Sequence, residues 1–90
     1  MSEIVEEVVV SNPLGLHARP AATLVQTTLQ FKSEVYIDMN GRRVNAKSIM
    51  GLLTLAAAQG TRLQVHCAGE DADLAMSAIR ELFEAGFGEH

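Results

Sequence analysis

The sequence is poor in aromatic residues and cysteine, and each shortage narrows the possible fold. Its 90 residues include no Trp, one Tyr and three Phe, an aromatic share of 4%. The core must therefore be built mainly from Val, Leu, Ile, Ala and Met. A single cysteine, Cys67, excludes an internal disulfide and a four-cysteine metal site, and suggests a reducing compartment.

Basic residues and long apolar runs are also scarce. Seven Lys and Arg stand against eleven Asp and Glu, a formal net charge of −4, which argues against nucleic acid as the main partner. No apolar run approaches the roughly 20 residues of a membrane-spanning helix. Residues 1–7 are acidic and lack the basic region of a secretory signal. These features predict a cytoplasmic protein that contacts no membrane, and the length predicts one domain over residues 1–90.

Alternating and helical periodicities predict seven secondary-structure elements. Residues 34–39 alternate between apolar and polar side chains, and Asn40-Gly41 is typical of a two-residue hairpin turn. Strands are expected over residues 4–10, 34–39, 42–46 and 62–68, and helices over 20–29, from Ser48 to a stop at Gly60, and over 72–85. The order β-α-β-β-α-β-α predicts an α+β fold with an antiparallel sheet and helices on one face. Ferredoxin-like domains share the first six elements, and the pattern leaves the strand order open.

The segment of residues 15–21, GLHARPA, holds the residues with the clearest chemistry. His17 lies just before a helix whose first amides lack intrahelical acceptors, so an anion attached to it would meet free N–H donors. The Arg19 guanidinium can hold phosphate oxygens through two parallel hydrogen bonds. No carboxylate is expected near His17, which disfavours a hydrolase triad. The segment predicts a place that holds a phosphoryl group; the alternative is that His17 is a polar loop residue that caps the helix.

A second segment, residues 47–51, combines a capping residue with an excess of apolar side chains. Ser48 is expected at the N-cap of the second helix. Four large apolar residues follow within five positions, more than one buried stripe requires: Ile49, Met50, Leu52 and Leu53. Some of them are expected to form an exposed patch that adapts to partners.

Both segments resemble one known family. Residues 15–21 match the G-[LI]-H-x-R-P-A pattern of HPr, the phosphocarrier family of the bacterial phosphoenolpyruvate-dependent phosphotransferase system. The likeness continues through residues 40–41, 47–51, 59–60 and 69–71 and covers nearly the whole chain. It implies an open-faced β-sandwich, in which a four-stranded antiparallel sheet is covered on one face by three helices.

The resemblance also implies a function in sugar transport through that system. His17 would accept a phosphoryl group on Nδ1 from phosphorylated Enzyme I and pass it to a IIA domain, and Arg19 would pair with the group. The chain would be a monomeric carrier with no cofactor and no enzymatic turnover of its own. The alternative is a regulatory interaction module controlled by Ser48 without a role in sugar transport.

In the family, a serine placed like Ser48 is a regulatory phosphorylation site for the HPr kinase/phosphorylase. Such a phosphoserine would hinder phosphorylation of His17 and control binding to transcriptional regulators. The expected docking surface joins the two segments and contains Ala18, Arg19, Ala22, Lys47, Ile49, Met50 and Leu53. Leu55 is a further candidate for this surface, although Leu53 and Leu55 also fit a place in the core.

Other chemically notable residues are expected to be structural. His17, His66 and His90 show no metal-ligand spacing, so no metal site is predicted. His66 falls on the polar face of its strand, where a solvated side chain is expected, and Cys67 falls on the apolar face, where a core residue is expected. Residues 86–88, GFG, are expected to end the last helix, not to form a phosphate loop.

Overall fold

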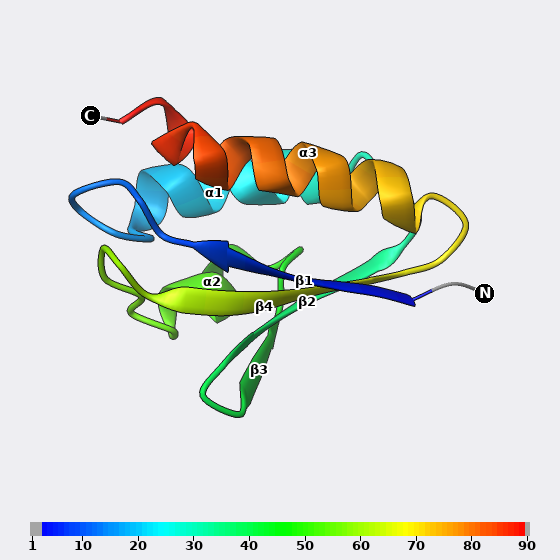
Figure 1. Cartoon of the computed structure of the whole chain (residues 1–90), viewed down its shortest axis with the longest axis horizontal. Coiled ribbons are helices and arrows are strands. Elements are labelled where there is room, and N and C mark those ends of the chain that lie inside the picture. The colour runs from blue at the N-terminus through cyan, green and yellow to red at the C-terminus, as the bar shows by residue number, and fades with distance from the viewer. Residues whose placement is uncertain (1–2, 90) are drawn as a thin grey trace.

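The computed structural model of the chain describes residues 3–89. In chain order its elements are β1 (Glu3–Val9), α1 (Ala18–Thr28), β2 (Glu34–Met39), β3 (Arg42–Asn45), α2 (Ile49–Leu53), β4 (Arg62–Ala68), α3 (Ala72–Glu84) and the short 3₁₀ helix η1 (Gly86–Gly88). The predicted order of strands and α-helices is confirmed (Figure 1).

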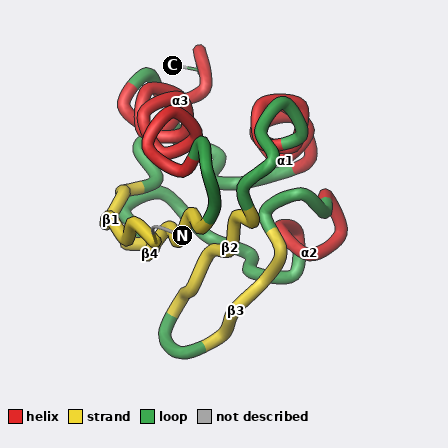
Figure 2. Tube along the Cα trace, turned by 90° about the vertical axis from the view of Figure 1, so that its right-hand side faces the viewer, coloured by secondary structure: helices red, strands yellow, loops and turns green. Residues whose placement is uncertain are grey.

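The strand order, which the sequence pattern left open, is β1-β4-β2-β3, and all neighbouring strands are antiparallel. Figure 2 shows the three α-helices on the same side of this sheet. No described segment covers the opposite face, so the expected open-faced sandwich is confirmed. β4 lies between β1 and β2, which places the last strand at the centre of the hydrophobic layer.

The alternation in the strands determines which side chains enter the core. Val35 and Ile37 of β2 are buried, and Ile37 lies opposite the buried Val65 of β4. The turn between β2 and β3 has φ of 51° at Asn40 and 85° at Gly41, as a hairpin turn with two left-handed residues requires. The predicted hairpin is therefore confirmed.

The helices close the core from above the sheet. α1 buries Leu24 and Val25, and α3 buries Met76, Ile79 and Phe83. Burial of one such large apolar side chain contributes about 1.5–3 kcal/mol. This packing holds α1 and α3 in place against the sheet, and so positions the first turn of α1 and the last turn of α3 in space.

Two helix boundaries differ from the expectation. α1 begins at Ala18 instead of Pro20, because the His17 carbonyl already accepts the first helical bond, from the Ala21 amide at 3.0 Å. Pro20 thus lies in the first turn, where a missing N–H is tolerated.

The second helix is the larger error, since α2 ends at Leu53 and does not continue to Gly60. Beyond it, Ala56 turns into the left-handed region at φ 49°, and Leu55 is buried in the core. The Ala57 carbonyl then accepts a hydrogen bond from the Leu16 amide at 2.9 Å. This pairing with a distant loop, which helical periodicity does not reveal, ends the helix early.

Candidate functional site

His17 is the N-cap of α1, and its ring is partly open to solvent. Its backbone is extended, with φ −82° and ψ −170°, and its side chain makes no capping hydrogen bond. The amides of Ala18 and Arg19 donate to no acceptor within residues 3–89. The positive end of the α1 dipole and two free donors therefore lie next to a histidine that is not occupied as a cap.

A close backbone contact holds the loop that carries His17. Gly15 has φ 73°, and a Cβ at this position would lie 2.4 Å from the Ala57 carbonyl oxygen. The neighbouring Leu16 is buried, and its amide bonds to the same Ala57 oxygen. Only glycine allows the backbone to come this close to Ala57, so Gly15 determines how closely the loop packs against the core.

Two shallow hollows flank the His17 loop. One, of about 290 Å³, is lined by Pro13, Leu14, Arg19, Gly88 and Glu89. The other, of about 280 Å³, is lined by Leu14, Leu16, His17, Leu53, Ala56, Ala57 and Ala58. The first hollow offers a guanidinium that can bind phosphate oxygens, and the second offers an apolar surface next to the imidazole.

Leu14 borders both hollows and is 77% exposed, which makes it one of the most exposed apolar side chains of the described residues. Leu14 was not predicted to belong to the docking surface. Its place between Pro13 and Gly15 in a turn, where the chain protrudes, was the available signal.

Glu89 lies directly against His17, which contradicts the expectation that no carboxylate is near this histidine. Its Oε1 lies 2.9 Å from His17 Nε2 and 2.9 Å from the Nδ2 of the buried Asn12. The hydrogen bond with His17, assisted by the one from Asn12, holds the pKa of the Glu89 carboxyl below its usual value. No local sequence pattern indicates this contact, because the two residues are 72 positions apart.

The chain after α3 is folded so that it brings Glu89 back to this loop. Gly86, Phe87 and Gly88 all have left-handed backbones, with φ of 59°, 55° and 75°. For a non-glycine residue such as Phe87 this costs on the order of 1–3 kcal/mol. The Phe87 ring packs edge-on against Phe83, with centroids 4.9 Å apart, which offsets the strain.

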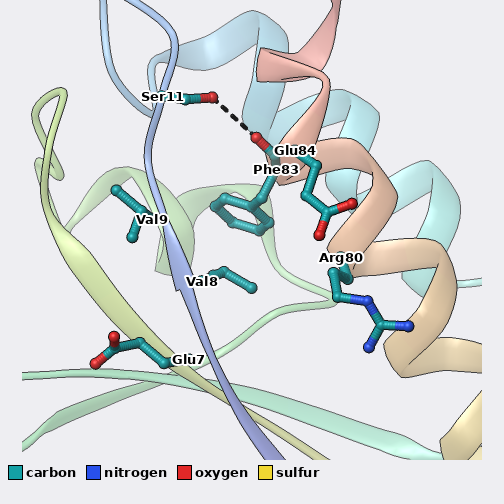
Figure 3. Close-up of a pocket in the computed structure, with 7 residues that line it drawn as sticks. All are labelled: Glu7, Val8, Val9, Ser11, Arg80, Phe83 and Glu84. Atoms are coloured by element: carbon teal, nitrogen blue, oxygen red, sulfur yellow. Dashed lines mark hydrogen bonds between the residues drawn. The ribbon is translucent and has the colours of Figure 1, made fainter.

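The end of β1 is tied to the end of α3 next to this turn. Ser11 donates a hydrogen bond to the Phe83 carbonyl at 2.9 Å, drawn in Figure 3. Figure 3 shows the adjoining hollow of about 320 Å³, lined by side chains of β1 and α3. One of its lining residues, Arg80, pairs with Glu6 at 2.6 Å. This hollow contains no histidine or cysteine and lies outside the His17 site.

The second predicted segment is also arranged as expected in its main features. Ser48 is the N-cap of α2, and its Oγ accepts a hydrogen bond from the Gly51 amide at 3.0 Å. Ile49 is 39% exposed and Met50 72% exposed, whereas Leu52 is buried. The excess of apolar residues in this segment is therefore divided between core and surface.

The remaining residues of the predicted docking surface vary in exposure. Ala18 and Arg19 are exposed, and Ala22 is half-buried. Leu53 is half-buried and packs against the core, and Leu55 is 2% exposed, so Leu55 belongs to the core and not to the surface. The Lys47 ammonium donates to the Phe31 carbonyl at 2.9 Å, which holds it close to the body of the protein.

The expectation for His66 was wrong, and that for Cys67 is confirmed. The His66 side chain is only 16% exposed and pairs with Asp38 at 2.9 Å on the open face of the sheet. Arg43 binds the same Asp38 and lowers the pKa of its carboxyl. Cys67 is buried, and desolvation raises the pKa of its thiol to about 11.

Two further observations concern ligands and membranes. Within residues 3–89, no three His, Cys, Asp or Glu side chains gather in a group that could hold a metal ion. His90, also considered above, lies outside the described residues. None of the described helices has the length and apolar character needed to cross a membrane.

Comparison with known proteins assigns this arrangement to a family. Residues 4–85 match the family model described as the PTS HPr component phosphorylation site. The chain belongs to the HPr family. It is 54% identical over 83 residues to the phosphocarrier protein HPr of Xylella fastidiosa, covering 92% of this chain and 93% of that one.

Other HPr-like proteins agree in sequence and in structure. A crystal structure described as HPr-C-His from Thermoanaerobacter tengcongensis superposes with a TM-score of 0.90 at 40% identity, covering 100% of this chain and 99% of that one. The chain is also 43% identical to a segment of the multiphosphoryl transfer protein of Salmonella typhimurium, covering 92% of this chain and 23% of that protein. This HPr-family chain is thus a phosphocarrier of the phosphotransferase system and not an enzyme.

Proposed function

We propose that this phosphocarrier accepts a phosphoryl group on Nδ1 of His17 from phosphorylated Enzyme I and passes it to a IIA domain. The observation that carries the proposal is the position of His17 at the α1 N-cap, beside the free amides of Ala18 and Arg19. These donors and the exposed guanidinium of Arg19 supply positive potential where a phosphoryl dianion needs it. Its setting would be the cytoplasm, and its working form a monomer consisting of the single domain 1–90.

The transfer requires only an exposed nucleophile and neutralised charge. The bond between phosphorus and the donor breaks and its electron pair leaves with the donor, while the Nδ1 lone pair forms the new P–N bond. Delivery to the acceptor is the same exchange with His17 as the leaving group. The ring is 36% exposed, so a partner can approach it without any opening of the fold.

The proposed docking surface surrounds His17 and extends to α2. It comprises Leu14, Ala18, Arg19, Ala22, Lys47, Ile49, Met50 and Leu53. Exposed Met50 and Leu14 give it apolar contact area, and a methionine side chain adapts to partners of different shape. Such a surface suits a carrier that must bind a donor and an acceptor in turn.

A direct test is phosphorylation by Enzyme I and phosphoenolpyruvate, followed by intact mass measurement. We expect one phosphoryl group per chain, lost on brief acid treatment and absent from His17→Ala. His66→Gln is the matched control, because it removes a histidine far from α1 and should leave labelling intact. Failure of the wild-type protein to accept the label from a competent Enzyme I would refute the proposal.

We also propose that Ser48 is a regulatory phosphorylation site for the HPr kinase/phosphorylase. A phosphoserine at the N-cap of α2 is electrostatically tolerated, because it lies at the positive end of the helix dipole. It would, however, add negative charge beside the exposed Ile49 and Met50, and so hinder the docking of a phosphorylated partner. Acid-stable label from ATP and the kinase, absent from Ser48→Ala, is expected; no label on the wild type refutes this proposal.

The alternative function is an interaction module that binds transcriptional regulators through the Ser48 surface. The exposure of Ile49 and Met50 next to Ser48 is the observation that supports it. The two functions separate cleanly in the labelling experiments. A pure interaction module would take acid-stable label from the kinase and no acid-labile label from Enzyme I.

A further inference from the structure

Glu89 contacts the ring nitrogen of His17 that the proposed phosphoryl transfer does not use. Its Oε1 lies 2.9 Å from Nε2, whereas Nδ1 has no hydrogen-bond partner within residues 3–89. Figure 1 shows the C-terminal segment at the end of the molecule where α1 begins. The fold therefore supplies His17 with a carboxylate on one side and leaves the other nitrogen open.

The surroundings of Glu89 determine which nitrogen carries the proton. An ionised carboxylate can only accept hydrogen bonds, and the amide of Asn12 already donates one to Oε1. The pKa of Glu89 is lowered by these partners, so the carboxyl is ionised at neutral pH. Nε2 must then be the donor in the hydrogen bond with Glu89. In a neutral imidazole this leaves the lone pair on Nδ1.

We propose that Glu89 is a positioning residue for His17: by accepting the Nε2–H bond, it holds the neutral ring in the tautomer whose Nδ1 is free to bond phosphorus. The proposal rests on His17 being the phosphoryl acceptor, as proposed above. A carboxylate that fixes the tautomer and orientation of a reactive histidine is a general device of nucleophilic and acid–base sites.

The same contact stabilises the charge that develops during transfer. When Nδ1 gives its lone pair to phosphorus, the bond from phosphorus to the donor breaks and its electrons leave with the donor. The Nε2 proton stays in place, so the ring gains positive charge next to the Glu89 carboxylate. The hydrogen bond becomes stronger as the reaction proceeds, which lowers the barrier to transfer.

Several features of the structure hold Glu89 in its contact with His17. Its side chain is only 17% exposed, and the left-handed turn at residues 86–88 aims it back at the loop. Phe87, packed against Phe83, anchors this turn, and Ser11 ties the end of α3 to the end of β1. These contacts hold the C-terminal segment where Glu89 can reach His17.

The first experiment measures the tautomer of His17 directly by ¹⁵N NMR of the ring nitrogens at neutral pH. In the wild type we expect the Nε2–H form. In Glu89→Ala the ratio of the Nε2–H to the Nδ1–H form should fall about three- to tenfold, because a charge-assisted hydrogen bond is lost. Glu89→Gln should lie between them, since its amide oxygen can still accept. Glu70→Gln removes an exposed carboxylate elsewhere and should match the wild type.

The second experiment measures phosphorylation of the same variants by phosphoramidate, a small donor that releases ammonia as its P–N bond breaks. We expect Glu89→Ala to react about three- to tenfold more slowly than the wild type at Nδ1, with Glu89→Gln between them. Thermal melts of all variants check that the fold is intact. Glu89→Gln keeps the size of the side chain if Glu89→Ala proves unstable.

The outcomes separate this inference from the proposed function. An unchanged tautomer ratio in both Glu89 variants, or a wild-type ring in the Nδ1–H form, overturns the role of Glu89. Wild-type protein that Enzyme I does not label at His17 overturns the carrier proposal itself, whatever the tautomer. Normal labelling at Nδ1 with a tautomer and rate insensitive to Glu89 overturns only the inference.

Discussion

Gly15→Ala tests whether the close approach of the His17 loop to the backbone at Ala57 shapes the site. An added Cβ would lie 2.4 Å from the Ala57 oxygen, about 1 Å short of ordinary contact. The left-handed φ of 73° costs an alanine about 1–2 kcal/mol, and the forced displacement about 1–3 kcal/mol more. We therefore expect the free energy of unfolding to fall by about 2–5 kcal/mol in total.

Gly41→Ala is the matched control, because Gly41 has φ 85° but no atom within 4 Å of its added Cβ. It should lose only the conformational part, about 1–2 kcal/mol. Since the chain has no Trp, far-UV circular dichroism during urea unfolding is the suitable assay. Equal losses in the two variants would refute the argument that a steric contact at Ala57 holds the loop. Gly15→Ala should also slow phosphorylation of His17, and Gly41→Ala should not.

Three further predictions concern the cap of α2, an acidic residue and the buried thiol. Ser48→Ala should lower the free energy of unfolding by about 1 kcal/mol, because the Gly51 amide loses its acceptor. Ser48→Thr should retain most of this stability, and the midpoints of urea unfolding of the two variants test the difference. Hydrogen bonds, chiefly from the Ser33 hydroxyl, hold the pKa of Asp71 at about 2, below its usual value near 4. Its stabilising contribution is therefore complete above about pH 4 and is lost as the pH falls toward 2. In Asp71→Asn the melting temperature should fall less steeply as the pH is lowered from about 4 to 2. An unchanged pH dependence would contradict this. Cys67, with a pKa of about 11, should resist a thiol reagent at neutral pH until the protein is unfolded in urea, and rapid labelling of the native state would show that it is not buried.

Local patterns predicted the strands, the hairpin turn and the cap of α2 well. The alternation of Val35 and Ile37 and the Asn40-Gly41 turn depend on neighbouring residues, so their structure could be derived from the sequence. The N-cap position of Ser48 follows from the same kind of local signal, and the structure places its side chain accordingly. Strand order, in contrast, depends on pairings between distant segments, and the pattern was silent about it.

The larger missed features arise from contacts between residues far apart in the chain. α2 ends early because the segment after it pairs with the loop at Leu16. Glu89 reaches His17 only because three left-handed residues reverse the chain after α3, and one of them, Phe87, is a residue that seldom takes this conformation. His66 is drawn out of solvent by Asp38 on a neighbouring strand.

The most direct test of the account is to locate the phosphoryl group by NMR after phosphorylation of ¹⁵N-labelled protein with Enzyme I and phosphoenolpyruvate. We expect a single phosphoramidate signal whose ³¹P nucleus couples to Nδ1 of His17, while Nε2 keeps its proton. Coupling to Nε2 of His17, or a phosphoryl group on any other residue, would contradict it.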